Sequence, residues 1–173
     1  MEHVRSSVSI GSEVPADAAR ELLTLAQRLA SETPGFFDVK GPGRGNHATN
    51  MFINSLRRQA EEHFGGDHAE QNICGSSGFC VDYYFPNEAT IVEIALGLKK
   101  PNTEFEKDVW KAVLAQEAGN AVSRLVFISK PGAIAKCQQP GRAAIIQMLE
   151  RQHGIAVEVH ELAPPLSDSG NQA

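Results

Sequence analysis

Two acidic residues stand alone in otherwise apolar stretches and are the first candidates for chemistry. Asp82 lies in FCVDYYF and Glu93 lies in ATIVEIAL. Both stretches are rich in aromatic and β-branched residues, which predicts strands at Phe79–Phe85 and Ala89–Leu96. The intervening Pro86–Glu88 is typical of a tight turn. The sequence therefore predicts a β-hairpin with one carboxylate on each strand.

The register of this hairpin decides what the two acids can do. If Phe85 faces Thr90, Asp82 lies directly opposite Glu93, and like charges at such a distance destabilise a sheet. A divalent cation would relieve this repulsion, since Mg²⁺ binds one or two carboxylates and completes its shell with water and phosphate oxygens. The alternative is that both acids face solvent on the open side of a sheet.

Apolar periodicity elsewhere predicts the elements that surround the hairpin. Helical spacing predicts helices at 17–30, 48–64 and 140–152. A further helix is expected from 103 onward, where a Pro-Asn-Thr start signal stands. Further strands are expected at 71–74, 121–129 and 155–162. This order predicts an α/β fold with a mixed central sheet, in which an antiparallel meander is followed by helix-strand crossovers and helices cover both faces.

Composition is that of one globular domain without a basic field. The chain has 173 residues, 42% of them hydrophobic, and a net charge of −5. We expect a flexible segment at 1–14, a single domain at 15–162 and a disordered tail at 163–173. No signal peptide or long apolar span is visible, so a cytoplasmic protein with no membrane partner is expected. Three cysteines without CxxC spacing do not indicate a disulfide framework or a zinc site.

The order of elements, with Asp82 in CVDYYF and Glu93-Ile94-Ala95 in IVEIAL, resembles the restriction-endonuclease-like fold of the PD-(D/E)XK phosphodiesterase superfamily. The resemblance implies a Mg²⁺- or Mn²⁺-dependent endonuclease acting on nucleic acid, with DNA favoured. It implies Asp82, Glu93 and the backbone carbonyl of Ile94 as metal ligands. It also implies an acid from an upstream helix, for which Glu61 is the first choice and Glu62 the second.

One residue departs from the superfamily pattern. Ala95 occupies the position where the superfamily usually has a lysine, which would stabilise transition-state charge. Lys99 and Lys100 lie too far along, since six strand residues span about 20 Å. On the following helix, Lys107 and Lys111 both lie away from the apolar arc, and Lys107 is favoured as the substitute.

Two further interpretations stay open beside a nuclease. The chain could be a catalytically degenerate member of the same fold that binds nucleic acid or protein, which Ala95 and the acidic net charge favour. It could also form a homodimer through Trp110 and Leu114, which broaden the apolar surface of their helix. Burial of these two side chains in the core is the favoured interpretation.

Overall fold

The computed structural model describes residues 17–38, 47–100 and 103–165. The N-terminal segment 1–14 and most of the tail 163–173, predicted to be flexible and disordered, lie outside these ranges. The Pro-Asn pair before the predicted third helix also lies outside them. Within the described ranges, no helix is long and apolar enough to cross a membrane.

Five strands form one mixed sheet in the order β1-β2-β3-β4-β5. The strands are β1 (Ala69–Gln71), β2 (Val81–Phe85), β3 (Thr90–Ile94), β4 (Arg124–Ser129) and β5 (Ala156–Glu161). The first three form an antiparallel meander, whereas β4 runs parallel to both β3 and β5. The predicted mixed sheet, with its meander and crossovers, is therefore confirmed.

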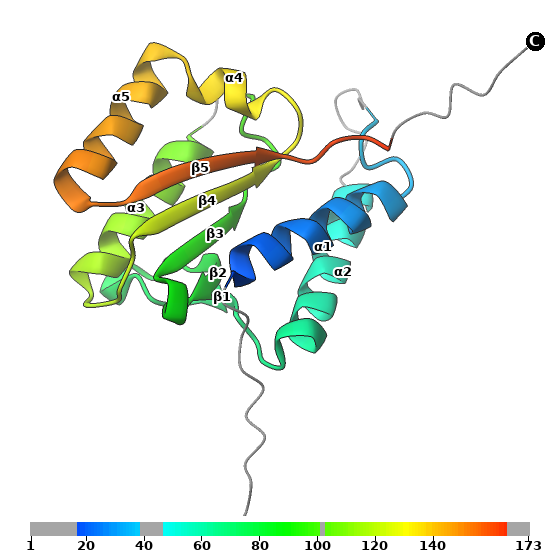
Figure 1. The fold of residues 1–173 in the computed structure, drawn as a ribbon, viewed down its shortest axis with the longest axis horizontal. Coiled ribbons are helices and arrows are strands. Elements are labelled where there is room, and N and C mark those ends of the chain that lie inside the picture. The colour runs from blue at the N-terminus through cyan, green and yellow to red at the C-terminus, as the bar shows by residue number, and fades with distance from the viewer. Residues whose placement is uncertain (1–16, 39–46, 101–102, 166–173) are drawn as a thin grey trace, which may run out of the picture.

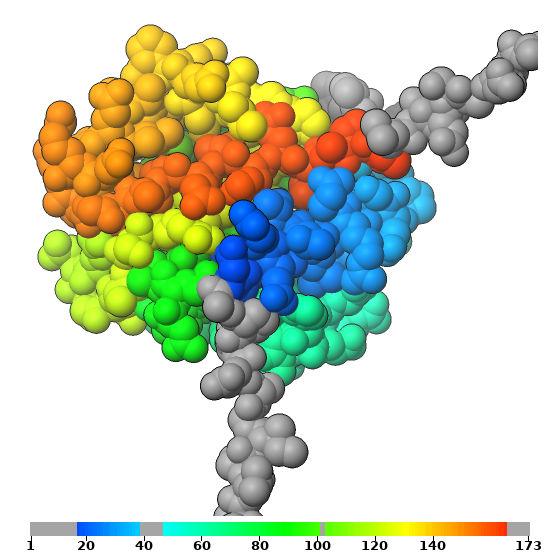
Figure 2. All heavy atoms as spheres, viewed as in Figure 1, coloured from blue at the N-terminus to red at the C-terminus, as the bar shows by residue number. Residues whose placement is uncertain are grey.

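Helices cover both faces of this sheet, as Figure 1 shows. Helices α1 (Ala18–Glu32) and α2 (His47–Phe64) pack together on one face. Helices α3 (Glu104–Glu117), α4 (Ala133–Cys137) and α5 (Pro140–Met148) lie on the other. The space-filling view in Figure 2 shows α1 lying against β5. Gln27 on α1 exchanges two hydrogen bonds with the backbone of Ala163, which follows the end of β5.

Alternation along β3 divides the core into two apolar layers, because successive strand residues point to opposite faces. Val92 packs in the layer beneath α1 and α2. Ile91 and Ala95 pack in the layer beneath α3, together with Phe105. Glu93 lies between Ile91 and Ala95 in this alternation, so the strand directs its side chain toward α3.

Several elements differ from their predicted bounds. The first strand is at Ala69–Gln71 rather than 71–74, because Ala69 pairs with Tyr83 and Cys74 already begins a 3₁₀ turn. The hairpin strands are shorter than predicted, since β2 begins at Val81 and β3 ends at Ile94. Ala89 has a positive φ of 49° and precedes β3, which begins at Thr90. The short helix α4 was not predicted.

Trp110 is not buried in the core, contrary to the favoured interpretation. Its side chain is 59% exposed on α3, whereas Leu114 is partly buried against the apolar layer. Trp110 lies on the side of α3 opposite the buried Ala112, so the apolar arc of the helix ends before it. A homodimer through Trp110 stays a prediction.

Candidate functional site

The hairpin places Asp82 and Glu93 together, as its predicted register requires. Phe85 pairs with Thr90, and continuing the same register sets Asp82 beside Glu93. Asp82 is half-buried, and its Oδ2 accepts a hydrogen bond of 2.7 Å from the backbone N–H of Ile94. Glu93 is only 1% exposed, so the alternative that both acids face solvent is wrong.

Helix α3 supplies a buried cation and a third acid to this pair. The Nζ of Lys111 lies 3.1 Å from Oε2 of Glu93 and 2.8 Å from Oδ1 of Asp108. All three side chains are less than a tenth exposed. One ammonium group is therefore shared by two buried carboxylates, which lie within hydrogen-bonding distance of it.

The prediction that Lys111 lies away from the sheet is wrong. Asp108 and Lys111 are 4% and 7% exposed, so the buried arc of α3 is wider than its apolar residues alone indicate. Asp108 and Lys111 lie on the border of this wider arc, one helical turn apart, where both reach the end of the hairpin. A polar pair at i, i+3 next to two buried alanines was the signal that could have identified them.

Burial and mutual repulsion set the protonation of the cluster. Burial raises the pKa of Glu93 well above its usual range, and the neighbouring Asp82 and Asp108 raise it further. Burial also raises the pKa of Asp108 to about 6. For Lys111, burial lowers the pKa, but the Glu93 and Asp108 carboxylates outweigh it and raise the pKa above its usual value. Lys111 is therefore charged at neutral pH.

One carboxylate oxygen in this cluster has no partner. Oε1 of Glu93 is buried and accepts no hydrogen bond from the described residues, which is costly for a carboxylate. Three acids, Asp82, Glu93 and Asp108, act electrostatically on one another around the single cation of Lys111. The local excess of negative charge and the unpartnered oxygen both favour a second cation.

Two carboxylates are the side-chain donors considered for such a cation. Across the described ranges, no group of three or more His, Cys, Asp or Glu side chains is arranged to hold a metal ion. Mg²⁺ does not need such a group, because it is usually held by one or two carboxylates and keeps several waters. Asp82 and Glu93 fit this kind of weakly chelated hard cation, and Ile94, whose carbonyl is the third predicted ligand, lines the same cavity.

The cluster opens into a cavity of about 310 Å³, which we call the hairpin hollow. Residues from α2 and α3, which cover opposite faces of the sheet, both line it, so it lies at an edge of the sheet. Its walls include Ile53, Arg57, Glu70, Asp82, Glu93, Ile94, Glu104, Lys107, Asp108 and Lys111. Asp82 and Glu93 both line this cavity.

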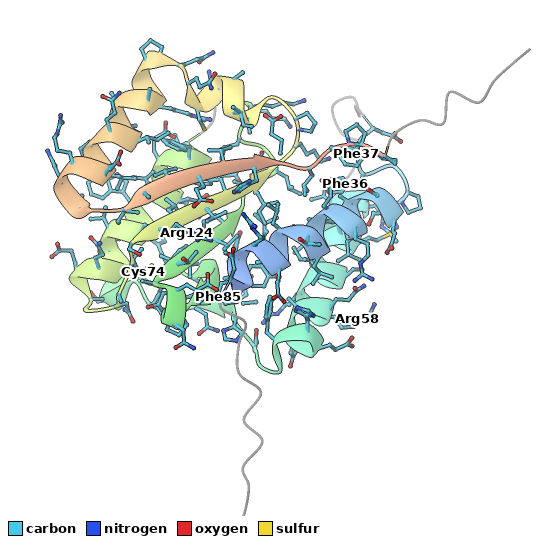
Figure 3. The ribbon with its side chains drawn as sticks, viewed as in Figure 1. Phe36, Phe37, Arg58, Cys74, Phe85 and Arg124 are labelled. Atoms are coloured by element: carbon cyan, nitrogen blue, oxygen red, sulfur yellow. The ribbon has the colours of Figure 1, made fainter. Side chains whose placement is uncertain are left out.

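The favoured lysine and the favoured helix acids lie in different places. Lys107 lines the hairpin hollow, but its Nζ is directed over the ring of Phe79, 5.6 Å from the centroid. Glu61 and Glu62 do not line this hollow. They line a separate depression with Arg58, which Figure 3 labels on α2. The structure therefore does not bring the predicted helix acid to Asp82 and Glu93.

Comparison with protein families, curated proteins and solved structures finds no match for this chain. The chemistry of the site is therefore inferred from its own geometry. Its defining features are two adjacent carboxylates on a hairpin, a buried lysine held by Glu93 and Asp108, and an open cavity beside them.

Proposed function

We propose that the chain is a metal-dependent phosphodiesterase that hydrolyses nucleic-acid backbone bonds in the hairpin hollow. The observation that carries the proposal is the buried, unpartnered Oε1 of Glu93 beside Asp82 and Lys111. Such an oxygen is poorly suited to a purely structural ion pair, whereas a divalent cation would use it as a ligand.

The residues of the hollow divide into two roles. Asp82, Glu93 and the carbonyl of Ile94 would hold Mg²⁺ or Mn²⁺. When bound, such an ion lowers the pKa of water and neutralises charge on a phosphoryl group. Lys111 would provide a fixed positive charge near the attacking water or a phosphate oxygen, because Glu93 and Asp108 hold its ammonium in place.

Lys111 thereby supplies the positive charge that Ala95 cannot provide. Ala95 is 1% exposed and its methyl group packs in the apolar layer beneath α3. Lys111 reaches the same layer of the sheet from the helix above it and contacts the acid two residues before Ala95. We therefore assign the catalytic lysine to Lys111 rather than to Lys107, whose ammonium is directed toward Phe79.

A nucleic-acid-binding or protein-interaction module without catalysis is the second candidate. The close ion pairs of Lys111 favour it, because they already neutralise part of the charge on Glu93 and Asp108 without a metal. In that case the hollow would bind a phosphate-containing or acidic ligand without hydrolysing it.

Metal binding tests the first step of the proposal. Mn²⁺ titration monitored by calorimetry should show binding to the parent and at least tenfold weaker binding to Asp82→Asn. Glu117→Gln, an exposed acid on α3, serves as the control that removes one negative charge elsewhere and should bind like the parent. A parent that binds no Mn²⁺, or an Asp82→Asn variant that binds it equally well, would contradict the metal site.

Cleavage of mixed single- and double-stranded oligonucleotides tests the assignment of the lysine. Lys111→Met should lower the metal-dependent cleavage rate by about 100-fold or more, as loss of a transition-state charge contact does. Lys107→Met should have a much smaller effect, and Lys136→Met on α4 none. Breaking a buried pair costs about 3–5 kcal/mol of stability, so folding is checked by circular dichroism and Lys111→Arg is measured alongside.

The same assay separates the two candidate functions. A nuclease shows Mn²⁺-dependent cleavage by the parent that Asp82→Asn and Glu93→Gln both abolish. Oligonucleotide binding by the parent without any such cleavage would reject the enzyme and leave the binding module.

A further inference from the structure

A second cavity adjoins the hairpin hollow. It has a volume of about 430 Å³ and shares Ile53, Ile94 and Glu104 with that hollow as common walls. We call it the lysine groove, because its lining includes Lys99, Lys100 and Lys130, together with Phe37, Asp38, Thr49, Leu96 and Gly97. A ligand in one cavity can therefore extend into the other across these three shared residues.

The lysine groove lies where two parallel strands end. Leu96 and Gly97 follow the end of β3, and Lys130 follows the end of β4. Ligands of open α/β sheets bind outside the carboxyl ends of the strands. Figure 3 labels Phe37 beyond the end of α1, on the side toward which the arrowheads of β4 and β5 point.

The two cavities differ in charge. The hairpin hollow is lined by five acidic and three basic side chains. The lysine groove is lined by two acidic and three basic side chains, and one of the two acids is the shared Glu104. An acidic cavity suited to a cation therefore continues into a basic cavity suited to an anion. A polyphosphate chain with a divalent ion bound at one end has the complementary charges, because the ion suits the acidic cavity and the remaining phosphates suit the basic one.

Contacts with neighbouring residues hold Lys130 and the turn that carries Lys99 and Lys100 in place. Lys130 donates a hydrogen bond to the carbonyl of Phe36 and lies over its ring, 4.4 Å from the centroid. The turn that carries Lys99 and Lys100 is anchored by the buried Arg142, which donates to the carbonyls of Leu98 and Lys100.

Lys99 and Lys100 are the cations available to a ligand. Both are exposed, and neither has an ion pair or side-chain hydrogen bond with the described residues. Their turn is held by its backbone while their ammonium groups stay open to solvent. They can therefore bind a phosphate without first breaking an internal ion pair.

We propose that the lysine groove binds backbone phosphates of a nucleic-acid strand that flank the bond in the hairpin hollow. The substrate is then a chain of several nucleotides, because one phosphate lies in the hollow while neighbouring phosphates contact Lys99 and Lys100. This inference rests on the proposed function for the role of the hollow, but it is measured by binding alone.

The test measures binding of a fluorescent 12-nucleotide single strand by anisotropy in Ca²⁺, at several salt concentrations. The double variant Lys99→Ala/Lys100→Ala should bind at least tenfold more weakly than the parent. Its slope of log affinity against log salt should be shallower by about 1.4, since each phosphate contact to a single strand contributes about 0.7. The control Lys136→Ala/Arg151→Ala removes the same charge from α4 and the turn after α5, and should change affinity by less than twofold.

Two outcomes would contradict the proposal that the lysine groove binds backbone phosphates. Equal losses in the double variant and in the control would mean that net charge alone governs binding. An unchanged affinity and salt slope in the double variant would mean that the strand does not contact the groove. Circular dichroism checks the folding of both double variants, and the exposed Lys99→Ala/Lys100→Ala should preserve it.

Two smaller probes identify the source of the phosphate. A dinucleotide, which is too short to reach the groove, should bind the parent and the double variant equally. Inorganic tripolyphosphate should displace the 12-nucleotide strand only at concentrations well above the dissociation constant of the strand. Displacement at concentrations equal to that constant would assign the groove to free polyphosphates and overturn the proposal.

Failure of the groove and failure of the proposed function can be distinguished. If Lys99→Ala/Lys100→Ala loses binding while no Mn²⁺-dependent cleavage is found, phosphate binding in the lysine groove is supported and the proposed catalysis is rejected. If Asp82→Asn abolishes cleavage while the double variant binds and cleaves like the parent, the proposed catalysis is supported and phosphate binding in the lysine groove is rejected.

Discussion

Lys111 lies in a cluster of buried charges. Its ammonium contacts two buried carboxylates, and the oxygen Oε1 of Glu93 remains without a partner. Taking ions out of water usually costs more than their attraction returns, so apolar side chains of similar size would often be as stable or more stable. A cation bound to Glu93, as proposed above, would give this oxygen a partner.

The raised pKa of Asp108 gives a pH dependence of stability. Its carboxyl has a pKa of about 6 in the folded chain against 3.8 in the reference state, so the folded chain holds this proton more tightly. The free energy of unfolding therefore falls as the pH rises from about 4 through about 6. A shift of about 2 pK units corresponds to about 3 kcal/mol. Asp108→Asn should remove this part of the pH dependence.

Urea unfolding at several pH values, in EDTA, measures this effect. Between pH 4 and pH 7 the parent should lose about 3 kcal/mol more stability than Asp108→Asn. Glu117→Gln, which removes an exposed acid from the same helix, should follow the parent. Identical pH profiles for the parent and Asp108→Asn would show that Asp108 does not titrate in this range.

At the scale of elements, α5 supports the turn that follows β3. Arg142 on α5 is 6% exposed, lies 5.0 Å from the ring centroid of Phe105, and donates to the carbonyls of Leu98 and Lys100. Arg142→Lys keeps the charge but loses the forked donors, so one carbonyl is left without its partner. We expect a loss of about 1–3 kcal/mol in the free energy of unfolding.

The same substitution should also weaken oligonucleotide binding, because the turn that presents Lys99 and Lys100 loses its anchor. Urea unfolding and the anisotropy measurement in Ca²⁺ are made on the same preparations. Arg151→Lys, at an exposed position after α5, is the matched control and should change neither quantity. Loss of stability with unchanged binding would show that Arg142 supports the core and not the groove.

The sequence predicts the secondary-structure elements better than it predicts how they pack against one another. The hairpin register followed from local pairing, since Phe85 opposite Thr90 was sufficient to place Asp82 beside Glu93. The contact of Lys111 with Glu93 depends on the rotation and height of α3 over the sheet, which no local pattern contains. The apolar arc identified the buried face of α3, but long side chains at its border reach inward as well.

At the scale of the whole molecule, net charge and local charge have opposite signs where a strand would bind. The chain carries −5, so its long-range field repels nucleic acid. The lysine groove is a local exception that adjoins the acidic hairpin hollow. A strand that reaches both cavities therefore gains attraction from Lys99 and Lys100 and meets repulsion from Asp82 and Glu93.

This balance predicts that a divalent ion controls binding before any chemistry occurs. In EDTA the acids of the hollow repel the phosphate, so Ca²⁺ should raise the affinity for the 12-nucleotide strand about tenfold or more. Asp82→Asn should bind several-fold more tightly than the parent in EDTA, because one repelling charge is gone, and should gain little from Ca²⁺. Glu117→Gln removes the same charge outside the hollow and should respond to Ca²⁺ like the parent. Equal affinities of the parent in EDTA and in Ca²⁺ would show that the strand does not approach Asp82 and Glu93.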